Sequence, residues 1–599
     1  MNSNQIEAFY VPKSYGTYSD TCLMLGLACL AEYALDATGQ KQGMQLIDEG
    51  ICYQIQFNKP MDLSKIKSVS YFDLFPIVAG AKTKTEKIPK EIHYFSTVEN
   101  SQARSLFKTL PRKIREKWRE DVPDPPDSRT QNGTILTSMR HDRNHNGLWE
   151  EAWKLREHFG ELVSTTLEVF SDRDIVLQDS AVDSIAKTFK QKTGEKLPTQ
   201  ASAVKIYMPS SIQGINRVLA DGIGSNSQKD AWLNLWLIAK GLFDFAVSER
   251  IKITDKTFDW RVVVLEPRDI SLNHYRSVLN DLRKKSLIGS GYGIARFDAE
   301  LALRFSQEML NLSCKTSRKP KLVSFFRGSH FGSKGQVYGL KDIFSLGLPN
   351  WIKVSSDETK KAIALHKVLA EHLSVVRSLD EKHTEILAAY RDFITGKELE
   401  LFFPFQASYA EYVIKQLADL KANNPYLFST EGLNTMVRNF KNKTEEQDWS
   451  INEIIENPGF LRIAKAINQA TVYAGKIQTK DGVKELDWQR NYGLAQRLSS
   501  HADSEKDFIR ELTSFLISYE NENVRLTEKL QKDGKKLYRV WTNKEDLDQV
   551  FSLIKDKRFG CSLVANLLVA YGYAKWSKKL SEEKPEDEFE ITEETNNKK

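Results

Sequence analysis

The sequence lacks the residues from which a disulfide framework or a cysteine-based zinc site is built. Its five cysteines are odd in number, lie far apart and never form a CxxC pair. We therefore expect a reducing, cytoplasmic environment. Long apolar runs are also scarce: residues 22–35 and 561–574 are each about four turns of helix, too short to cross a bilayer. We expect no membrane partner.

A large excess of charge of one sign is missing as well. The chain holds 86 Lys and Arg against 80 Asp and Glu, a formal net charge of +6. This balance alone does not indicate a nucleic-acid partner. The distribution is more informative, because residues 581–599 contain the acidic run SEEKPEDEFEITEE. We expect residues 578–599 to form an acidic, disordered tail, which leaves the rest of the chain more basic than the whole.

Compact catalytic motifs are absent too. Residues 328–334, GSHFGSK, fail the P-loop pattern because Ser333 separates the second glycine from the lysine. Residues 289–293, GSGYG, lack the third glycine and the acidic ribose ligand of a dinucleotide fingerprint. Neither GxSxG nor HExxH occurs. These absences favour a binding protein without a cofactor over an enzyme.

One constellation has metal-ligand character. His141, Asp142 and His145 lie within HDRNH, and histidine with aspartate is a common donor set for catalytic metals. A metal-dependent nuclease built on these three residues is therefore an alternative hypothesis. The simpler interpretation is a polar loop, because residues 121–147 are rich in Pro, Asp, Asn and Gly.

Hydrophobic periodicity divides the chain into two parts. Residues 1–356 mix short alternating strands with helices, whereas residues 357–577 show mainly helical periodicity. We predict an α+β fold, with a mixed N-terminal region of small sheets and helices followed by an all-α C-terminal helical bundle.

Individual segments give sharper expectations. Residues 232–247 are predicted as an apolar helix, and residues 203–208 and 262–265 as short strands. Thr542 and Glu545 match a T-x-x-E capping box that would begin a helix.

Three segments carry the residue types that bind nucleic acid. Residues 121–147 and 209–228 are polar, and residues 314–338 are basic, glycine-rich and aromatic. Positive charge follows a phosphate chain, aromatic planes stack on bases, and glycine lets the backbone approach a ligand closely. Residues 314–338 are alternatively a solvated basic strand followed by an ordinary glycine turn.

Short amides or a lysine on a loop can contact base edges, whereas Lys and Arg suit phosphates. The base-reading candidates are Gln131, Asn132, Gln213, Asn216, Lys334 and Gln336. The candidates for contacts with the DNA or RNA backbone are Arg112, Lys113, Arg115, Lys315, Arg318, Lys319, Lys321 and Arg327.

This layout resembles the large subunit of a type I CRISPR Cascade effector complex, of the type I-B or related Myxococcus-type branch. The resemblance covers most of residues 1–577. It lies in the mixed first part, the phrase LVSFFRGSHFGSKGQVYGLKDIF at residues 322–344, and the helical end VFSLIKDKRFGCSLVANLLVAYGYAKW at residues 550–576. Some relatives carry a cysteine zinc cluster, which this chain does not have.

The resemblance implies a non-catalytic subunit that recognises the protospacer-adjacent motif, a short flank on target duplex DNA, and aids strand separation and R-loop formation. The implied partners are a CRISPR guide RNA, the target double-stranded DNA with its displaced strand, and the backbone, guide-handle-binding and small subunits. A recruited helicase-nuclease or transposition adaptor completes the set. The helical part resembles the small subunit, and Met436 is a candidate internal start for a separate product. A sequence-neutral basic scaffold remains the other alternative.

Overall fold

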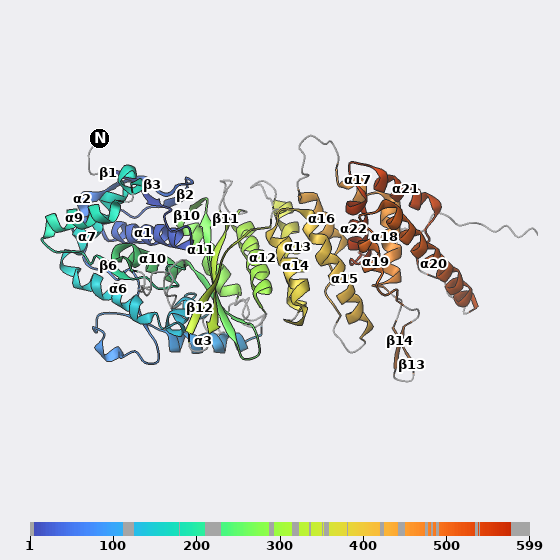
Figure 1. Cartoon of the computed structure of the whole chain (residues 1–599), viewed down its shortest axis with the longest axis horizontal. Helices are drawn as coiled ribbons and strands as arrows, with labels where there is room; N and C mark the ends of the chain where they lie inside the picture. The colour runs from blue at the N-terminus through green and yellow to red at the C-terminus, as the bar shows by residue number, and fades with distance from the viewer. Residues whose placement is uncertain are drawn as a thin grey trace, which may run out of the picture. The chain divides into compact units, whose positions relative to one another are not determined.

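The computed structural model describes most of the chain. The described residues are 5–111, 125–178, 180–209, 229–286, 293–313, 323–334, 337–349, 351–352, 359–379, 381–419, 424–440, 450–473, 477–480, 483–486, 490–532, 537 and 539–576. They form an α+β fold, as predicted (Figure 1).

The chain divides into two compact units. Unit 1 comprises Met1–Asn350, Val354–Ala362 and Asp380–Gly396, and unit 2 comprises Trp351–Lys353, Ile363–Leu379 and Lys397–Lys599. The predicted boundary at residue 356 thus lies close to the first crossing between the units. It misses the return of the chain to unit 1, where α14 (Thr384–Thr395) packs against α12 (Gly293–Ser313). The predicted tail, residues 578–599, lies outside the described residues.

Unit 1 contains the strands and most of the long connections. Its other elements are β1 (Gln5–Pro12), α1 (Tyr18–Ala37), β2 (Met44–Asp48), β3 (Cys52–Asp62), α2 (Leu63–Ile66), β4 (Ile77–Ala79), η1 (Thr85–Lys87), β5 (Tyr94–Ser96), α3 (Thr97–Thr109), α5 (Thr130–Ser138), α6 (Asp142–Lys154), η2 (Arg156–His158), α7 (Phe159–Phe170), α8 (Arg173–Leu177), α9 (Ala181–Thr193), β6 (Gln200–Ser202), β7 (Lys229–Ala231), α10 (Trp232–Phe245), β8 (Val247–Lys252), β9 (Phe258–Pro267), β10 (Asp269–Ser271), α11 (Leu272–Ser286), β11 (Val323–Lys334), β12 (Val337–Leu346) and η3 (Glu381–His383).

Two antiparallel sheets frame unit 1. One has the strand order β1-β3-β2-β10 and the other β12-β11-β9-β8. Helix α1 contacts strands of both sheets, and one hydrophobic core runs through sheets and helices alike. The predictions of a helix at residues 232–247 and a strand at 262–265 are confirmed by α10 and β9.

The most extensive contact between two described helices of this core joins α1 to α10, which lie side by side in Figure 1. Two glycines make it possible. A Cβ atom on Gly26 would lie 1.9 Å from the carbonyl oxygen of Leu237, and one on Gly241 would lie 2.0 Å from that of Cys22. Each helix therefore places a glycine against the backbone of the other, and any side chain at either position would force the helices apart.

The predicted loop at residues 121–147 is wrong over its described second half, which forms α5 and the first half of α6. Its polar residues serve tertiary contacts. Asn132 donates to the carbonyl oxygens of Leu242, Phe243 and Ala246 at the end of α10, at 3.3, 2.9 and 2.8 Å. Gly133 faces the ring of Phe95, where a Cβ atom would lie 2.7 Å from the ring. The hydrogen bonds of Asn132 and the contact of Gly133 with Phe95 join distant parts of the chain, so the local sequence pattern does not indicate them.

The predicted strand at residues 203–208 is a turn. The amides of Tyr207 and Met208 both donate to the carbonyl of Val204, at 2.9 Å. Helix α1 binds two other carbonyls of the turn: Tyr18 donates its hydroxyl to Ile206 at 2.8 Å, and Ser19 donates to Tyr207 at 2.6 Å. Side chains rather than a neighbouring strand thus satisfy these groups.

Unit 2 is mainly helical. Its elements are most of α13 (Thr359–Ser378), η4 (Leu399–Leu401), α15 (Phe402–Ala418), α16 (Thr430–Asn439), α17 (Asn452–Ile455), α18 (Pro458–Ala470), β13 (Ile477–Lys480), β14 (Val483–Leu486), α19 (Leu494–Ser500), α20 (Glu505–Lys532), α21 (Lys544–Lys555) and α22 (Cys561–Gly572). The hairpin β13–β14 departs from the all-α prediction. Helix α18 packs against α21 and α22, and α15 against α19 and α22.

Two local predictions in unit 2 need comment. The capping box lies one residue later than predicted: Asn543 and Asp546 exchange the two hydrogen bonds, whereas Thr542 binds Glu520 of α20 through both its amide and its hydroxyl. Met436 is 1% exposed inside α16, so a product beginning there would start within a core helix and lack α15.

The glycine contact between α1 and α10 gives a stability prediction. Gly26→Ala should lower the free energy of unfolding by about 1–3 kcal/mol, because its Cβ atom meets backbone rather than a movable side chain. The matched control is Gly147→Ala in α6, where the added atom would meet nothing within 4 Å. That change should be neutral or stabilise by up to about 1 kcal/mol. Urea unfolding followed by circular dichroism measures both, and equal midpoints would contradict the prediction.

Candidate nucleic-acid interface

Lys205 marks the place where the three predicted binding segments approach one another. Its ammonium group donates to the carbonyl oxygen of Tyr338 at 2.9 Å, close to the turn end of the β11–β12 hairpin. Burial, followed by the nearby charge of Lys205, lowers the pKa of His141 to about 4. Thus the α5–α6 junction, the turn that precedes residues 209–228, and the end of the 314–338 segment lie together.

The turn that carries Lys205 is fixed from two sides. Tyr18 and Ser19 bind its carbonyls from the first turn of α1, as described above. On the other side, the hydroxyl of Tyr207 bonds to Nδ1 of His145 in α6. Lys205 itself is only 8% exposed. It therefore positions the surrounding elements, and phosphate contacts would fall to its more exposed neighbours.

Arg140 is an exposed basic residue at this junction. It follows α5 in a left-handed conformation, with φ of 59°, the one non-glycine residue with positive φ within the described ranges. The amide of His141 donates to Leu136 at 2.7 Å and that of Arg140 to Thr137 at 3.2 Å. This is a Schellman helix end, where glycine is the favoured residue. An arginine here costs roughly 1–2 kcal/mol relative to a residue without a Cβ atom.

The aromatic and glycine residues of the β11–β12 hairpin mostly serve packing. Phe326 and Phe331 are fully buried, so they are not free to stack on bases. The ring of Phe344 covers Gly328, where a Cβ atom would lie 2.2 Å from it, and the side chain of Lys341 covers Gly332. The prediction that these glycines free the backbone for a ligand is wrong, because cross-strand side chains occupy the space they leave.

The charges of the hairpin are compensated within the fold. Asp259 of β9 accepts hydrogen bonds from His330, the amide of Ser333 and Lys341, at 2.9, 3.0 and 2.9 Å. Burial alone would raise the pKa of Asp259, but these donors hold it below its usual value. The carboxylate thus fixes the register of the hairpin end to β9.

Arg327 was predicted to contact the nucleic-acid backbone. Its Nε lies 3.3 Å from the carboxylate of Glu266, which is 1% exposed and also accepts a hydrogen bond from Thr21. The guanidinium lies over the ring of Phe325, 5.6 Å from its centre. A phosphate would have to compete with a buried carboxylate for this charge.

Two of the predicted base-reading residues lie in α5. Asn132 is 2% exposed and its amide group is bound to α10, so a base-reading role does not fit it. Gln131 is half-buried and donates to Glu249 at 2.9 Å, which also pairs with Arg104 at 2.6 Å. The side-chain amide of Gln131 is therefore bound to a carboxylate of the fold.

The remaining candidates are not placed. Lys334 ends β11, but its side chain is not described. Outside the described residues lie Gln213, Asn216, Gln336, Arg112, Lys113, Arg115, Lys315, Arg318, Lys319 and Lys321. These stay predictions, although the described residues that flank several of them lie at the junction around Lys205.

The metal hypothesis does not fit His145. The ring is fully buried; Nε2 lies 3.0 Å from the carbonyl of Pro76 and Nδ1 faces the hydroxyl of Tyr207. One nitrogen donates and the other accepts, which is the pattern of a neutral imidazole with no lone pair left for a metal. Over the described ranges, no group of three His, Cys, Asp or Glu residues has the geometry to hold a metal ion.

Lys205 and Arg140 were both missed by the sequence-based analysis. Nothing in the local pattern marks Lys205, because its importance comes from Tyr338, more than a hundred residues later. Arg140 had a weak signal: a helix ends there without the glycine that normally permits a left-handed residue.

The sequence matches no protein-family model, and no curated protein shows significant similarity to it. Where the structure is described, none of its helices is both long enough and apolar enough to span a lipid bilayer.

His145 gives a pH prediction. Burial lowers the pKa of His145 to about 4 from its usual value of 6.5, so the unfolded chain binds more protons between these two pH values. Stability is then complete above pH 6.5 and is lost as the pH falls. From pH 7.5 to pH 5 this residue should cost about 2 kcal/mol. In His145→Gln, unit 1 should lose correspondingly less stability over this range. The measurement is urea unfolding at both pH values, and an unchanged pH effect would refute the assignment.

Arg140 gives a second stability prediction. Arg140→Gly should raise the free energy of unfolding by about 1 kcal/mol, because the left-handed strain disappears. The control is Arg143→Gly, an exposed arginine in the first turn of α6 with ordinary helical geometry, which should destabilise by roughly 0.5–1 kcal/mol. A loss of stability in Arg140→Gly would mean that the arginine side chain makes a compensating contact.

Proposed function

We propose that this chain is the non-catalytic large subunit of a type I CRISPR RNA-guided surveillance complex. In this role it recognises the protospacer-adjacent motif on target duplex DNA, aids strand separation and R-loop formation, and recruits a helicase-nuclease or a transposition adaptor. Its other partners are the guide RNA and the backbone, guide-handle-binding and small subunits. Guide pairing reads the target sequence, so the protein has to read only a short flank.

The observation that carries the proposal is the junction around Lys205. Three segments that are far apart in the sequence each have a composition suited to nucleic acid. His145 of the first, Tyr338 of the third and the turn that immediately precedes the second lie together there. Flank recognition needs several short loops at one place, because two or three adjacent base pairs must be contacted at once. Independent surface loops would have no reason to converge.

The strained Arg140 supports the same conclusion. Glycine would make the same helix end at lower cost, but it would carry no charge. Strained backbone positions cluster at functional sites, and an exposed guanidinium beside the candidate base-reading loops is suited to a phosphate. Arg140 thus supplies the sequence-independent part of the contact, and residues 209–228 and 335–336 the sequence-dependent part.

A binding role is also favoured over the nuclease alternative. The nuclease would need His145 as a metal ligand or base, yet both its ring nitrogens already serve the contact between α6, Pro76 and Tyr207. The sequence offers no other compact catalytic motif.

The test uses the assembled complex with its guide RNA and a target library with a randomised flank. Arg140→Gly should weaken capture of every flank alike and reduce the salt dependence by about one phosphate contact. Lys187→Ala, which removes one exposed charge from α9, is the matched control and should change neither. Because Arg140→Gly should be the more stable protein, weaker capture would not reflect unfolding.

The second arm addresses sequence preference. Gln213→Ala, Asn216→Ala and Gln336→Ala should change which flank is preferred, by roughly 1–3 kcal/mol for each lost base contact. Equal capture of all flanks by the wild-type complex would refute flank recognition and favour the basic scaffold. Cleavage of DNA by the purified chain with Mg²⁺ or Mn²⁺ would refute the non-catalytic assignment.

A further inference from the structure

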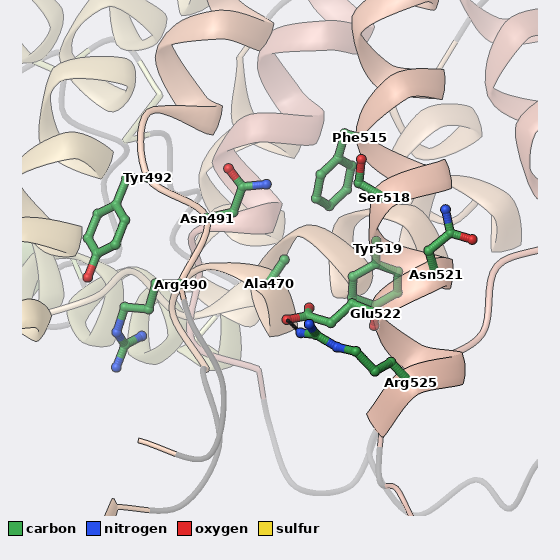
Figure 2. Close-up of a pocket in the computed structure, with 10 residues that line it drawn as sticks. All are labelled: Ala470, Arg490, Asn491, Tyr492, Phe515, Ser518, Tyr519, Asn521, Glu522 and Arg525. Carbon is green, nitrogen blue, oxygen red and sulfur yellow. Dashed lines mark ion pairs between the residues drawn. The ribbon is translucent and has the colours of Figure 1, made fainter. Parts of the chain in front are cut away.

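Unit 2 has a groove of about 530 Å³ on one side of α20. Figure 2 shows Phe515, Tyr519 and Arg525 along α20 on one wall and the segment with Arg490 and Tyr492 on the other. Phe515 and Tyr519 are buried, at 4% and 2% exposed, so the groove combines one exposed aromatic ring, that of Tyr492, with guanidinium groups. Tyr492 is 53% exposed and the side chain of Arg525 is 77% exposed.

The charge of the groove is positive on balance. Glu522, its one lining carboxylate among the described residues, pairs with Arg539 at 2.8 Å and lies 4.0 Å from Arg525. The stronger pair with Arg539 neutralises this acid, so Arg525 retains most of its attraction for an outside anion. Arg490 donates to the carbonyls of Thr471 and Val472, which holds its guanidinium at the wall.

The C-terminal end of α22 is held next to this groove. Asn468 donates to the carbonyl of Ala574 at 2.8 Å, two residues before the groove-lining Ala470. The amide of Ala495 donates to the hydroxyl of Tyr573 at 3.1 Å, three residues after Tyr492. Both contacts place Tyr573 and Ala574 beside the segments that carry Ala470 and Tyr492, and the next residue, Lys575, bonds through its amide to the carbonyl of Phe428 at 2.8 Å.

The sequence that follows has the complementary chemistry. Residues 582–594, EEKPEDEFEITEE, contain eight acidic residues and one lysine, together with Phe589 and Ile591. They begin six residues after Trp576, and six extended residues span up to about 20 Å. Carboxylates suit guanidinium groups, and Phe589 suits the exposed ring of Tyr492.

We propose that residues 582–594 bind this groove within the same chain. The acidic peptide then occupies a basic surface that carries the exposed ring of Tyr492, and it keeps other anionic polymers out of this groove. Tethering makes this binding efficient, because a short linker gives an effective concentration on the order of 1 mM. For an intrinsic Kd of about 0.1 mM, the groove would be about 90% occupied and an added competitor would bind about tenfold more weakly.

The test titrates a fluorescent peptide with the sequence of residues 582–594 against the full chain, read by anisotropy. A variant whose eight acidic residues in this segment are changed to Gln or Asn leaves the groove open. It should bind the peptide at least about tenfold more tightly than the wild type. Arg525→Glu in this background should abolish binding. Arg510→Glu, an exposed arginine on the same helix that does not line the groove, should leave binding unchanged.

The outcomes are decisive without DNA or the assembled complex. Equal binding to the wild type and the neutral-tail variant, or binding that survives Arg525→Glu, would overturn the proposal. Capture of a thymidine oligonucleotide but not of the peptide by the neutral-tail variant would also overturn it and assign the groove to nucleic acid. Because flank preference is not measured, failure here leaves the proposed function of unit 1 unaffected.

Discussion

The close contact between α1 and α10 is the constraint on which the rest of unit 1 depends. Gly26 and Gly241 let each helix approach the backbone of the other, so both are fixed as one rigid pair. The first turn of α1 then holds the turn at residues 203–208, and the end of α10 holds α5 through Asn132. The turn at residues 203–208 and the end of α5 meet at the junction around Lys205. The position of this junction therefore depends on the single contact between α1 and α10.

Charge alone is a poor guide to the interface. Arg327 and Lys341 belong to the basic part of the sequence, but each lies beside a buried carboxylate that compensates its charge. Lys205 donates to a backbone carbonyl. A guanidinium or ammonium that serves the fold in this way has already given up part of its hydration and cannot offer its full attraction to a phosphate. The buried carboxylates of Asp259 and Glu266 therefore determine which Lys and Arg side chains of the hairpin can bind a ligand.

Hydrophobic periodicity correctly predicted the elements in which nearly every residue is buried. The apolar run of α10 and the strand β9 were predicted because nearly every residue in them faces the core. It failed for α5, where Asn132 and Gly133 look like loop residues but meet α10 and Phe95. The segments of the candidate site could be predicted from composition. Their convergence could not, since the bond from Lys205 to Tyr338 joins distant parts of the chain.

The conformation of Arg140 separates two explanations for a polar junction. If the α5–α6 turn served only to connect helices, glycine would satisfy the same hydrogen bonds without the strain, and a cost of about 1 kcal/mol would bring nothing in return. Marginal stability tolerates such a cost, so strain alone does not establish a function. Strain indicates a function only when removal of the side chain both raises the free energy of unfolding and weakens binding in the same protein. A purely structural residue would move both properties in one direction, whereas a ligand-binding residue moves them in opposite directions.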